Sequence, residues 1–276
     1  MMVFIEIIFI IVIIALLNMF FINVIFKNRR NDRVIKSSTI TQQQWDEAYL
    51  SLPLLNGLSV EENKNLKELS ILFMHNKTFE GAQGFAITPK VLLTISLQAC
   101  LPILNLGLDC YKSFSTIIVY PSGFKTNRKV MGENGVVDYD RTHLLGESWL
   151  QGPVILSWSD SETAGEIDGS NLVIHEFVHK LDMQNGVANG FPPLHKNMRL
   201  NDWVSTFTKA FEYFERKCTG NNFHGIDCYA ATSPAEFFSV FSEVFFERPD
   251  RIEKYFPEVH ILLELYYLQT PIHRLS

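Results

Sequence analysis

The chain has 276 residues, of which 24 are basic and 30 are acidic, so its formal net charge is −6 at pH 7. A chain of this length can bury one sizeable hydrophobic core or two small ones. The slight acidic excess argues against a nucleic-acid-binding surface, and we find neither an internal repeat nor a low-complexity tract.

The first 33 residues are expected to form a membrane anchor with a basic flank. From Ile7 to Phe26 the sequence contains no charged side chain, and this length is enough to cross a bilayer as a helix. Four basic residues follow at once, namely Lys27, Arg29, Arg30 and Arg33. By the positive-inside rule we expect a single-pass protein of the inner (cytoplasmic) membrane, with residues 34–276 as one catalytic domain on the cytoplasmic side.

Helices are expected in the first part of that domain. Gln42 to Leu50 has a helical pattern, and the S-x-x-E sequence of Ser59 to Glu62 predicts a capping box that opens a second helix through about His75. Val91 to Tyr111 is apolar enough to be mistaken for a second membrane span. A buried pair of soluble helices is favoured by the polar residues and the proline within this segment, namely Gln98, Pro102, Asn105 and Asp109.

Two strands are expected on either side of a loop-rich region. Ser115 to Tyr120 and Pro153 to Trp158 are rich in β-branched and aromatic residues and are flanked by proline or glycine. Residues 120–150 contain four glycines and are expected to form loops, with room for a short hairpin. We therefore expect a mixed α+β fold that is mainly helical and has a small β-sheet.

The four cysteines are Cys100, Cys110, Cys218 and Cys228. They form no C-x-x-C motif, and two well-separated pairs do not make a zinc cluster. In a cytoplasmic body they are expected to be reduced thiols without a chemical role.

The sequence NLVIHEFVHKLDMQ, from Asn171 to Gln184, contains the pattern His-Glu-x-x-His. Asp168 to Ser170, just before it, offers helix N-caps, so the pattern should lie on a short helix. A spacing of four residues places His175 and His179 on one helix face, where both imidazoles can bind the same zinc ion. Glu176 can then reach a water on the metal without binding the metal itself.

The pattern also has an ordinary interpretation, namely a half-exposed helix with two unremarkable histidines and a solvated glutamate. The residues between and around the polar ones are apolar, however: Val173, Ile174, Phe177, Val178 and Leu181. Placing three titratable groups in such a helix is costly without a partner, which favours the metal site.

A catalytic zinc site usually needs a third protein ligand, which must come from elsewhere in the chain. Six downstream residues are candidates: His195, His224, Asp227, Glu236, Glu243 and Glu247. Ser233 and Pro234 form a strong helix start, which places Glu236 in the first turn and Glu243 two turns further along the same face. The residues alone leave the choice open, because Ser233-x-x-Glu236 is also a capping box in which the carboxylate would only cap the backbone.

Asp182 and Glu243 are candidates for residues that support the metal ligands from outside. Asp182 lies three residues after His179 on the ligand face, where it could accept the free N–H of a ligating imidazole. An ordinary carboxylate near the end of the helix is the alternative. Glu243 could support an imidazole in the same way or replace Glu236 as a ligand, and it ranks below Glu236.

Two segments together, VIHEFVHKLD (173–182) and YAATSPAEFFSVFSEVFF (229–246), resemble the Mlc titration factor family of MtfA-type zinc peptidases. Four further segments resemble this family in the same order: AQGF (82–85), LPILNLGLDCY (101–111), VYP (119–121) and SWLQGPVILSW (148–158). The resemblance covers most of residues 40–270. The metal centre of the family is similar to that of anthrax lethal factor, in which a tyrosine precedes the glutamate ligand by seven residues.

Carried across residue by residue, the resemblance implies that His175, His179 and Glu236 bind zinc. It also implies that Glu176 is the catalytic base and that Tyr229, seven residues before Glu236, assists the reaction. The residues alone would favour a packed core tyrosine at position 229.

The resemblance implies a zincin-like peptidase with an aminopeptidase-like action on short peptides. Its expected partners are a peptide or protein substrate and, through the N-terminal helix, the membrane, with no direct nucleic-acid contact. An interaction protein is the alternative, because the family takes its name from binding and sequestering a transcriptional repressor, Mlc. The best-known member of the family lacks the hydrophobic anchor, so the anchor is a departure of this chain.

Overall fold

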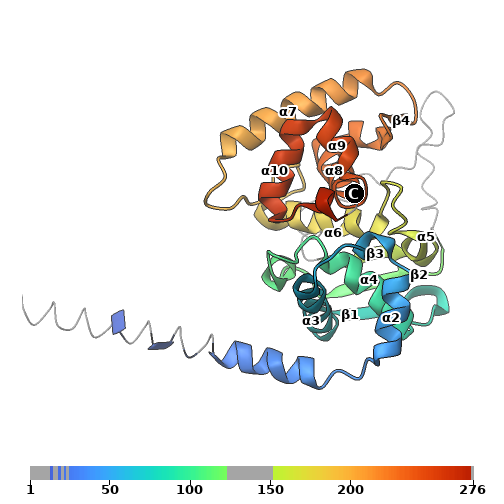
Figure 1. Ribbon diagram of the computed structural model, residues 1–276, viewed down its shortest axis with the longest axis vertical. Helices are drawn as coiled ribbons and strands as arrows, with labels where there is room; N and C mark the ends of the chain where they lie inside the picture. Colours follow the sequence, from blue (N-terminus) through green and yellow to red (C-terminus); the bar gives the residue numbers. More distant parts are fainter. Residues whose placement is uncertain (1–12, 15–17, 20–21, 23–24, 123–151, 275–276) are drawn as a thin grey trace, which may run out of the picture. The chain divides into compact units, whose positions relative to one another are not determined.

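The computed structural model of the protein describes residues 13–14, 18–19, 22, 25–122 and 152–274 (Figure 1). The chain divides into two compact units, Met1–Thr39 and Ile40–Ser276. The loop region expected at residues 120–150 lies almost entirely outside the described residues.

The expected membrane anchor is corrected by the described part of the first unit. Residues 25–36 form a helix, and this helix contains the charged residues that were expected to flank the span: Lys27, Arg29, Arg30 and Arg33. Most of the segment from Ile7 to Phe26 lies outside the described residues. Among the residues that the structure describes, no helix is both long enough and apolar enough to cross a membrane, which contradicts the expected single-pass membrane localisation.

Local capping signals begin the first helices of the second unit. Helix α2 (Gln42–Leu50) has Thr41 as its N-cap, and helix α3 (Val60–Asn76) has Ser59. In both cases the cap side chain and the residue three positions later form a complete capping box. Both expected helices are therefore confirmed.

The apolar segment from Val91 to Tyr111 forms one α-helix and a short 3-10 helix rather than the expected pair of helices. Helix α4 (Pro89–Cys100) is followed by turns and by the short 3-10 helix η3 (Leu108–Tyr111). Pro102 has no N–H to donate, and Gly107 has a φ of 85°, so both interrupt a regular helix. All residues of α4 from Leu93 onward are buried, as expected for a soluble core helix.

A small parallel sheet lies beside α4 and α6. Its strands are β1 (Thr78–Gly81), β2 (Thr116–Tyr120) and β3 (Val154–Ser157), in the order β1-β2-β3. In this register Phe79, Ile117 and Val154 lie opposite one another. The strands β2 and β3 confirm the expectation, whereas β1 was not expected because three of its four residues are exposed.

The second half of this unit is mostly helical. Its helices are α6 (Leu172–Asp182), α7 (Leu200–Lys217), α8 (Pro234–Glu247), α9 (Pro249–Tyr255) and α10 (Pro257–Tyr267). Figure 1 shows α6 between the sheet on one side and α7 to α10 on the other. The mainly helical fold with a small sheet agrees with the expected α+β class.

Helix α8 forms the centre of the aromatic core in this half. All of its residues are buried except Pro234 and Glu236. Phe237 stacks on Phe241 with ring centroids 3.8 Å apart, and Phe238 meets the edge of the Trp203 ring from α7. Such dense packing fixes the position of every side chain on the helix, including its glutamates.

A short hairpin connects α7 to α8. It consists of β4 (Asn222–Phe223) and β5 (Ile226–Asp227), and it is followed by the 3-10 helix η5 (Cys228–Ala231). The hairpin brings Cys218 and Cys228 together in a disulfide, with a Cα–Cα distance of 5.6 Å. The expectation of four reduced thiols is therefore wrong for this pair, because tertiary structure places the two side chains within bonding range. Cys100 and Cys110 are free thiols.

Candidate metal centre

Helix α6 begins at a buried asparagine. The side-chain oxygen of Asn171 accepts a hydrogen bond of 2.9 Å from the N–H of Ile174, so the N-cap lies just after the expected segment Asp168–Ser170. The Asn171 amide also donates to Gln98 of α4 and to Glu247 of α8, at 2.9 Å in each case. The start of α6 is therefore fixed by both neighbouring helices.

Three side chains from α6 and α8 converge on one point. The Nε2 atom of His175 lies 3.0 Å from Oε2 of Glu236 and 3.1 Å from Nε2 of His179. The Nε2 atom of His179 lies 3.3 Å from Oε2 of Glu236. Ligand atoms 2.0–2.1 Å from a tetrahedral zinc ion are about 3.3 Å from one another. The three atoms therefore have nearly the spacing of one face of such a site.

The carboxylate of Glu236 faces the histidines rather than the backbone. Ser233 accepts a hydrogen bond of 3.2 Å from the N–H of Glu236, which is only the first half of a capping box. The Oε2 atom of Glu236 is buried, and within the described chain no hydrogen-bond donor is directed at it in good geometry, although both imidazoles are close. Buried polar atoms normally have a partner, so this donor set fits a cation-binding site.

The charges at the centre shift one another's pKa. Burial lowers the pKa of His175, but the charge of Glu243, the close contact with Glu236 and the hydrogen bond to Glu243 outweigh burial and raise the pKa to about 10. Burial raises the pKa of Glu236, but the two imidazoles outweigh it and hold the pKa well below its usual range. A proton therefore binds strongly between these groups when no metal is present, and a divalent cation competes for the same place.

Glu243 contacts His175 on the side opposite the convergence point. Its Oε1 atom lies 2.7 Å from Nδ1 of His175, and its Oε2 atom accepts a hydrogen bond from the N–H of Asn171. The carboxylate is buried, and burial raises its pKa. The structure places the Glu243 carboxylate at Nδ1 of His175, while the Nε2 atom of His175 faces Glu236.

Asp182 is bound to the loop that follows α6. Its Oδ2 atom accepts hydrogen bonds of 2.7 Å from the N–H groups of both Asn189 and Gly190. The carbonyl of Gly190 accepts a hydrogen bond of 3.0 Å from Nε1 of Trp203. Burial raises the pKa of Asp182 to about 6. The structure thus brings Asp182 to this loop, whereas the expected hydrogen bond to an imidazole is not among its contacts in the described chain.

Ser239 takes the place expected for Asp182. Its Oγ atom lies 3.2 Å from Nδ1 of His179. Sequence reasoning missed this residue. Ser239 follows Glu236 by three residues, so a search of the same face of α8 would have found it.

Tyr229 lies beside the first histidine. Its ring centroid is 6.1 Å from that of His175, at an interplanar angle of 38°. The tyrosine is half-buried in η5, and its N–H donates a hydrogen bond of 2.9 Å to the Asp227 side chain. The ring therefore borders the site from the chain segment that precedes α8.

Glu176 is half-buried on α6, between the two histidines in sequence. Its charge contributes to the raised pKa of His175 and opposes the effect of burial on Lys180, whose pKa burial lowers to about 8. The charge of Glu176 therefore acts on the centre, but Glu176 is not a member of the His175–His179–Glu236 group.

The other candidate ligands are engaged elsewhere. Nε2 of His195 lies 2.7 Å from the carbonyl oxygen of Tyr266. The ring of His224 stacks on Tyr255 at 3.7 Å. Asp227 caps η5, and Glu247 accepts hydrogen bonds from the loop before α6. Within the described ranges, the only group of such side chains that could hold a metal ion is His175, His179 and Glu236.

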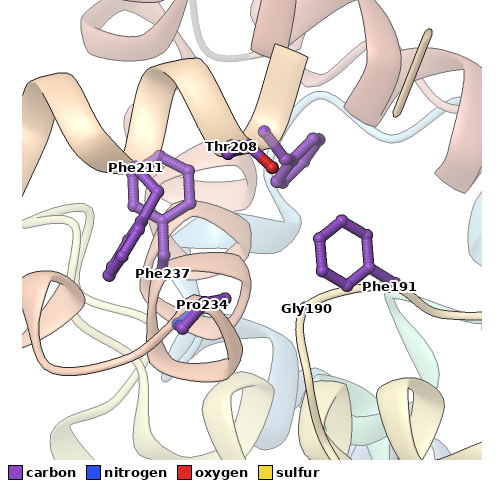
Figure 2. Close-up of a pocket in the computed structure, with 7 residues that line it drawn as sticks. Gly190, Phe191, Thr208, Phe211, Pro234 and Phe237 are labelled. Carbon is purple, nitrogen blue, oxygen red and sulfur yellow. The ribbon is translucent and has the colours of Figure 1, made fainter. Parts of the chain in front are cut away.

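A small apolar hollow lies at the start of α8. It is lined by Gly190, Phe191, Phe207, Thr208, Phe211, Pro234 and Phe237. Figure 2 shows Phe191 on one side, Phe211 and Phe237 on the other, and Pro234 at the edge. Gly190 is essential to this shape, because a Cβ atom there would lie 2.5 Å from the carbonyl oxygen of Pro234.

Comparisons with known proteins identify the family of the chain. The sequence profile of the family described as glucose-regulated metallo-peptidase M90 matches residues 26–268. The chain is 36% identical over 242 residues to Mlc titration factor A of Serratia proteamaculans, covering 86% of this chain and 90% of the relative. It is 35% identical over 245 residues to Mlc titration factor A of Escherichia coli, covering 88% and 92%. These matches confirm the family resemblance.

Proposed function

The chain belongs to the M90 family of glucose-regulated metallo-peptidases, and from this premise we propose that it is a zinc-dependent peptidase with His175, His179 and Glu236 as its metal ligands. The observation that carries the proposal is the triangle of their ligand atoms, with sides of 3.0, 3.1 and 3.3 Å. Two imidazoles and one carboxylate leave a fourth position open, as catalytic zinc sites require.

Glu176 is proposed as the general base. Bound zinc would lower the pKa of a coordinated water to about 7 and polarise the substrate carbonyl. The carboxylate of Glu176 would accept a proton from the attacking water and later deliver it to the leaving amine. Its place on α6, directly after His175, supports this role.

Tyr229 is proposed to stabilise the negative charge that develops on the substrate carbonyl oxygen. Its hydroxyl would donate a hydrogen bond to that oxygen, which is a contact made mainly in the transition state. The position of its ring next to His175 supports the assignment.

Glu243 and Ser239 are proposed to orient the two imidazoles. Each would hold an Nδ1 atom, so that both Nε2 atoms face the metal. The contacts pair each imidazole of α6 with a polar side chain of α8, so all four groups have partners in an otherwise apolar environment.

Metal removal tests the proposal. After treatment with a chelator the full-length protein should lose hydrolysis of short chromogenic peptides, and stoichiometric zinc should restore it. Glu236→Gln should bind zinc much more weakly, whereas Glu253→Gln, an exposed change on α9, should behave as the parent does. Full activity after verified removal of the metal would refute a metal-dependent mechanism.

The resemblance favours an aminopeptidase-like action. This predicts that peptides with a free α-amino group are hydrolysed faster than the same peptides after N-acetylation. Equal rates for the two series would argue for an endopeptidase instead.

Binding of a repressor is a second candidate function. It is favoured by the name of the relatives, Mlc titration factor A, which span most of this chain. Capture of an Mlc-type repressor by a Glu176→Gln variant would support binding that is independent of turnover. Failure of both the parent and the variant to retain the purified repressor would exclude this function.

A further inference from the structure

The disulfide between Cys218 and Cys228 joins the end of α7 directly to the segment that carries Tyr229. Cys218 is the C-cap of α7, and Cys228 is the first residue of η5. Tyr229 is therefore the next residue after the cross-link, and its ring borders His175 at 6.1 Å. The covalent bond acts one residue away from a side chain of the candidate centre.

The hairpin between the two cysteines has other anchors that do not involve the disulfide. Ile226 is fully buried, and the ring of Phe223 packs against Phe214 of α7 with centroids 5.9 Å apart. At the hairpin tip, Nη1 of Arg251 donates hydrogen bonds of 2.6 Å to the carbonyl of Gly225 and 2.8 Å to that of Asp168. The hairpin should therefore stay folded without the cross-link.

The segment just after the disulfide is held by hydrogen bonds at its start and by packing further along, where Ala230 is fully buried and η5 contacts α8. Besides the cross-link, η5 begins with one backbone hydrogen bond of 2.9 Å from Cys228 to Asn221 and one of 2.9 Å from the N–H of Tyr229 to the Asp227 side chain. Asn221 and Asp227 are both exposed, so these bonds compete with water. The disulfide adds a covalent connection to α7 at the residue directly before Tyr229.

We propose that the Cys218–Cys228 disulfide positions Tyr229 at the candidate metal centre, so that turnover depends on the oxidation state of this cysteine pair. The inference rests on the proposed function for the role of Tyr229. Both cysteines are half-buried, and residues 219–222, which follow Cys218, are exposed, so a small reductant can reach the disulfide. A displacement of about 1 Å at a catalytic group can lower a rate by up to about 100-fold.

The redox step is a simple two-electron exchange. A water-soluble phosphine would break the S–S bond and give two thiols, which take two electrons from phosphorus and two protons from water, while the water oxygen forms the phosphine oxide. The reverse step uses a low-molecular-weight disulfide such as oxidised glutathione, which accepts the two electrons and is released as two thiols.

The test compares oxidised and phosphine-reduced full-length protein loaded with zinc, using the short chromogenic peptides. Reduction should lower kcat roughly tenfold or more, with little change in KM or zinc content, because the lost contact is made in the transition state. Cys218→Ser should have the reduced protein's kcat and no response to phosphine. Cys110→Ser, which removes a half-buried free thiol, should keep the full response of the parent.

A Tyr229→Phe variant distinguishes positioning from general stabilisation. If the disulfide acts through the tyrosine hydroxyl, reduction of this variant should cause no further loss of kcat. The same fractional loss in Tyr229→Phe as in the parent, or no loss in the parent, would overturn the inference.

Hydrogen exchange keeps the inference testable even if the oxidised parent hydrolyses no peptide, an outcome that would count against the proposed function alone. Reduction should speed amide exchange in residues 227–232 while α6 is unchanged. Identical exchange in both oxidation states would refute the positioning role.

Discussion

The Oε1 atom of Glu243 lies 2.7 Å from Nδ1 of His175, so a carboxylate from the third turn of α8 holds a ring on α6. An Nδ1–H that donates to this carboxylate leaves Nε2 as the acceptor atom, and Nε2 is the atom that faces Glu236 and His179. The two helices therefore arrange the imidazole before any metal arrives.

Glu243→Gln should weaken zinc binding by about 10- to 100-fold, as is typical when the partner of a ligating histidine is changed. The amide lacks one of the two acceptor oxygens that Glu243 offers to His175 and Asn171. Competition with a zinc chelator would measure the change. An affinity equal to that of the parent would show that the contact does not support the metal.

Tyr229→Phe should retain zinc and lower kcat by about 100-fold, the usual effect of removing one hydrogen-bond donor to a developing oxyanion. KM should change little. Tyr255→Phe is the matched control, because this tyrosine stacks on His224 away from the centre. If both variants turn over as fast as the parent, Tyr229 is only a packed side chain.

Asp182 should make stability depend on pH. Its folded pKa of about 6 lies above the ordinary value of 3.8, so the folded protein binds more protons between these pH values. The free energy of unfolding should therefore fall as pH rises from about 4 to about 6, by at most about 3 kcal/mol from this group. Urea unfolding of Asp182→Asn should lack this component, and a parent-to-variant difference that is constant with pH would contradict the assignment.

Gly190→Ala should destabilise the protein more than Gly84→Ala. The two glycines have nearly equal φ angles, +79° and +78°, so alanine meets similar backbone strain at both. Only at Gly190 would the new Cβ also collide with the carbonyl of Pro234, and no atom lies within 4 Å at Gly84. In urea unfolding, Gly190→Ala should lower the free energy of unfolding by about 1–3 kcal/mol more than Gly84→Ala does. Equal losses for the two variants would mean that the loop at Gly190 shifts to accommodate the new Cβ atom.

Local signals explain which parts of the fold could be predicted. Capping boxes at Thr41 and Ser59 depend on residues three positions apart, so the starts of α2 and α3 could be read from the sequence. The shared face of His175 and His179 follows from helical periodicity in the same way.

Long-range contacts explain what could not be predicted. Glu243 and His175 are separated by 68 residues, and only the packing of α8 on α6 makes them neighbours. The disulfide likewise depends on a hairpin that has no strong turn signature in the sequence. The membrane expectation came from an apolar run that lies mostly outside the described residues, and no helix among the described residues is long and apolar enough to cross a membrane.

The most direct test of the proposed mechanism is to measure zinc content and peptide turnover together for the full-length parent and its Glu176→Gln variant. The substrates would be chromogenic peptides of small residues with a free amino terminus. We predict one zinc per chain in both proteins, turnover in the parent, and almost none in the variant. A parent without zinc, or a variant that turns over as fast as the parent, would contradict the account.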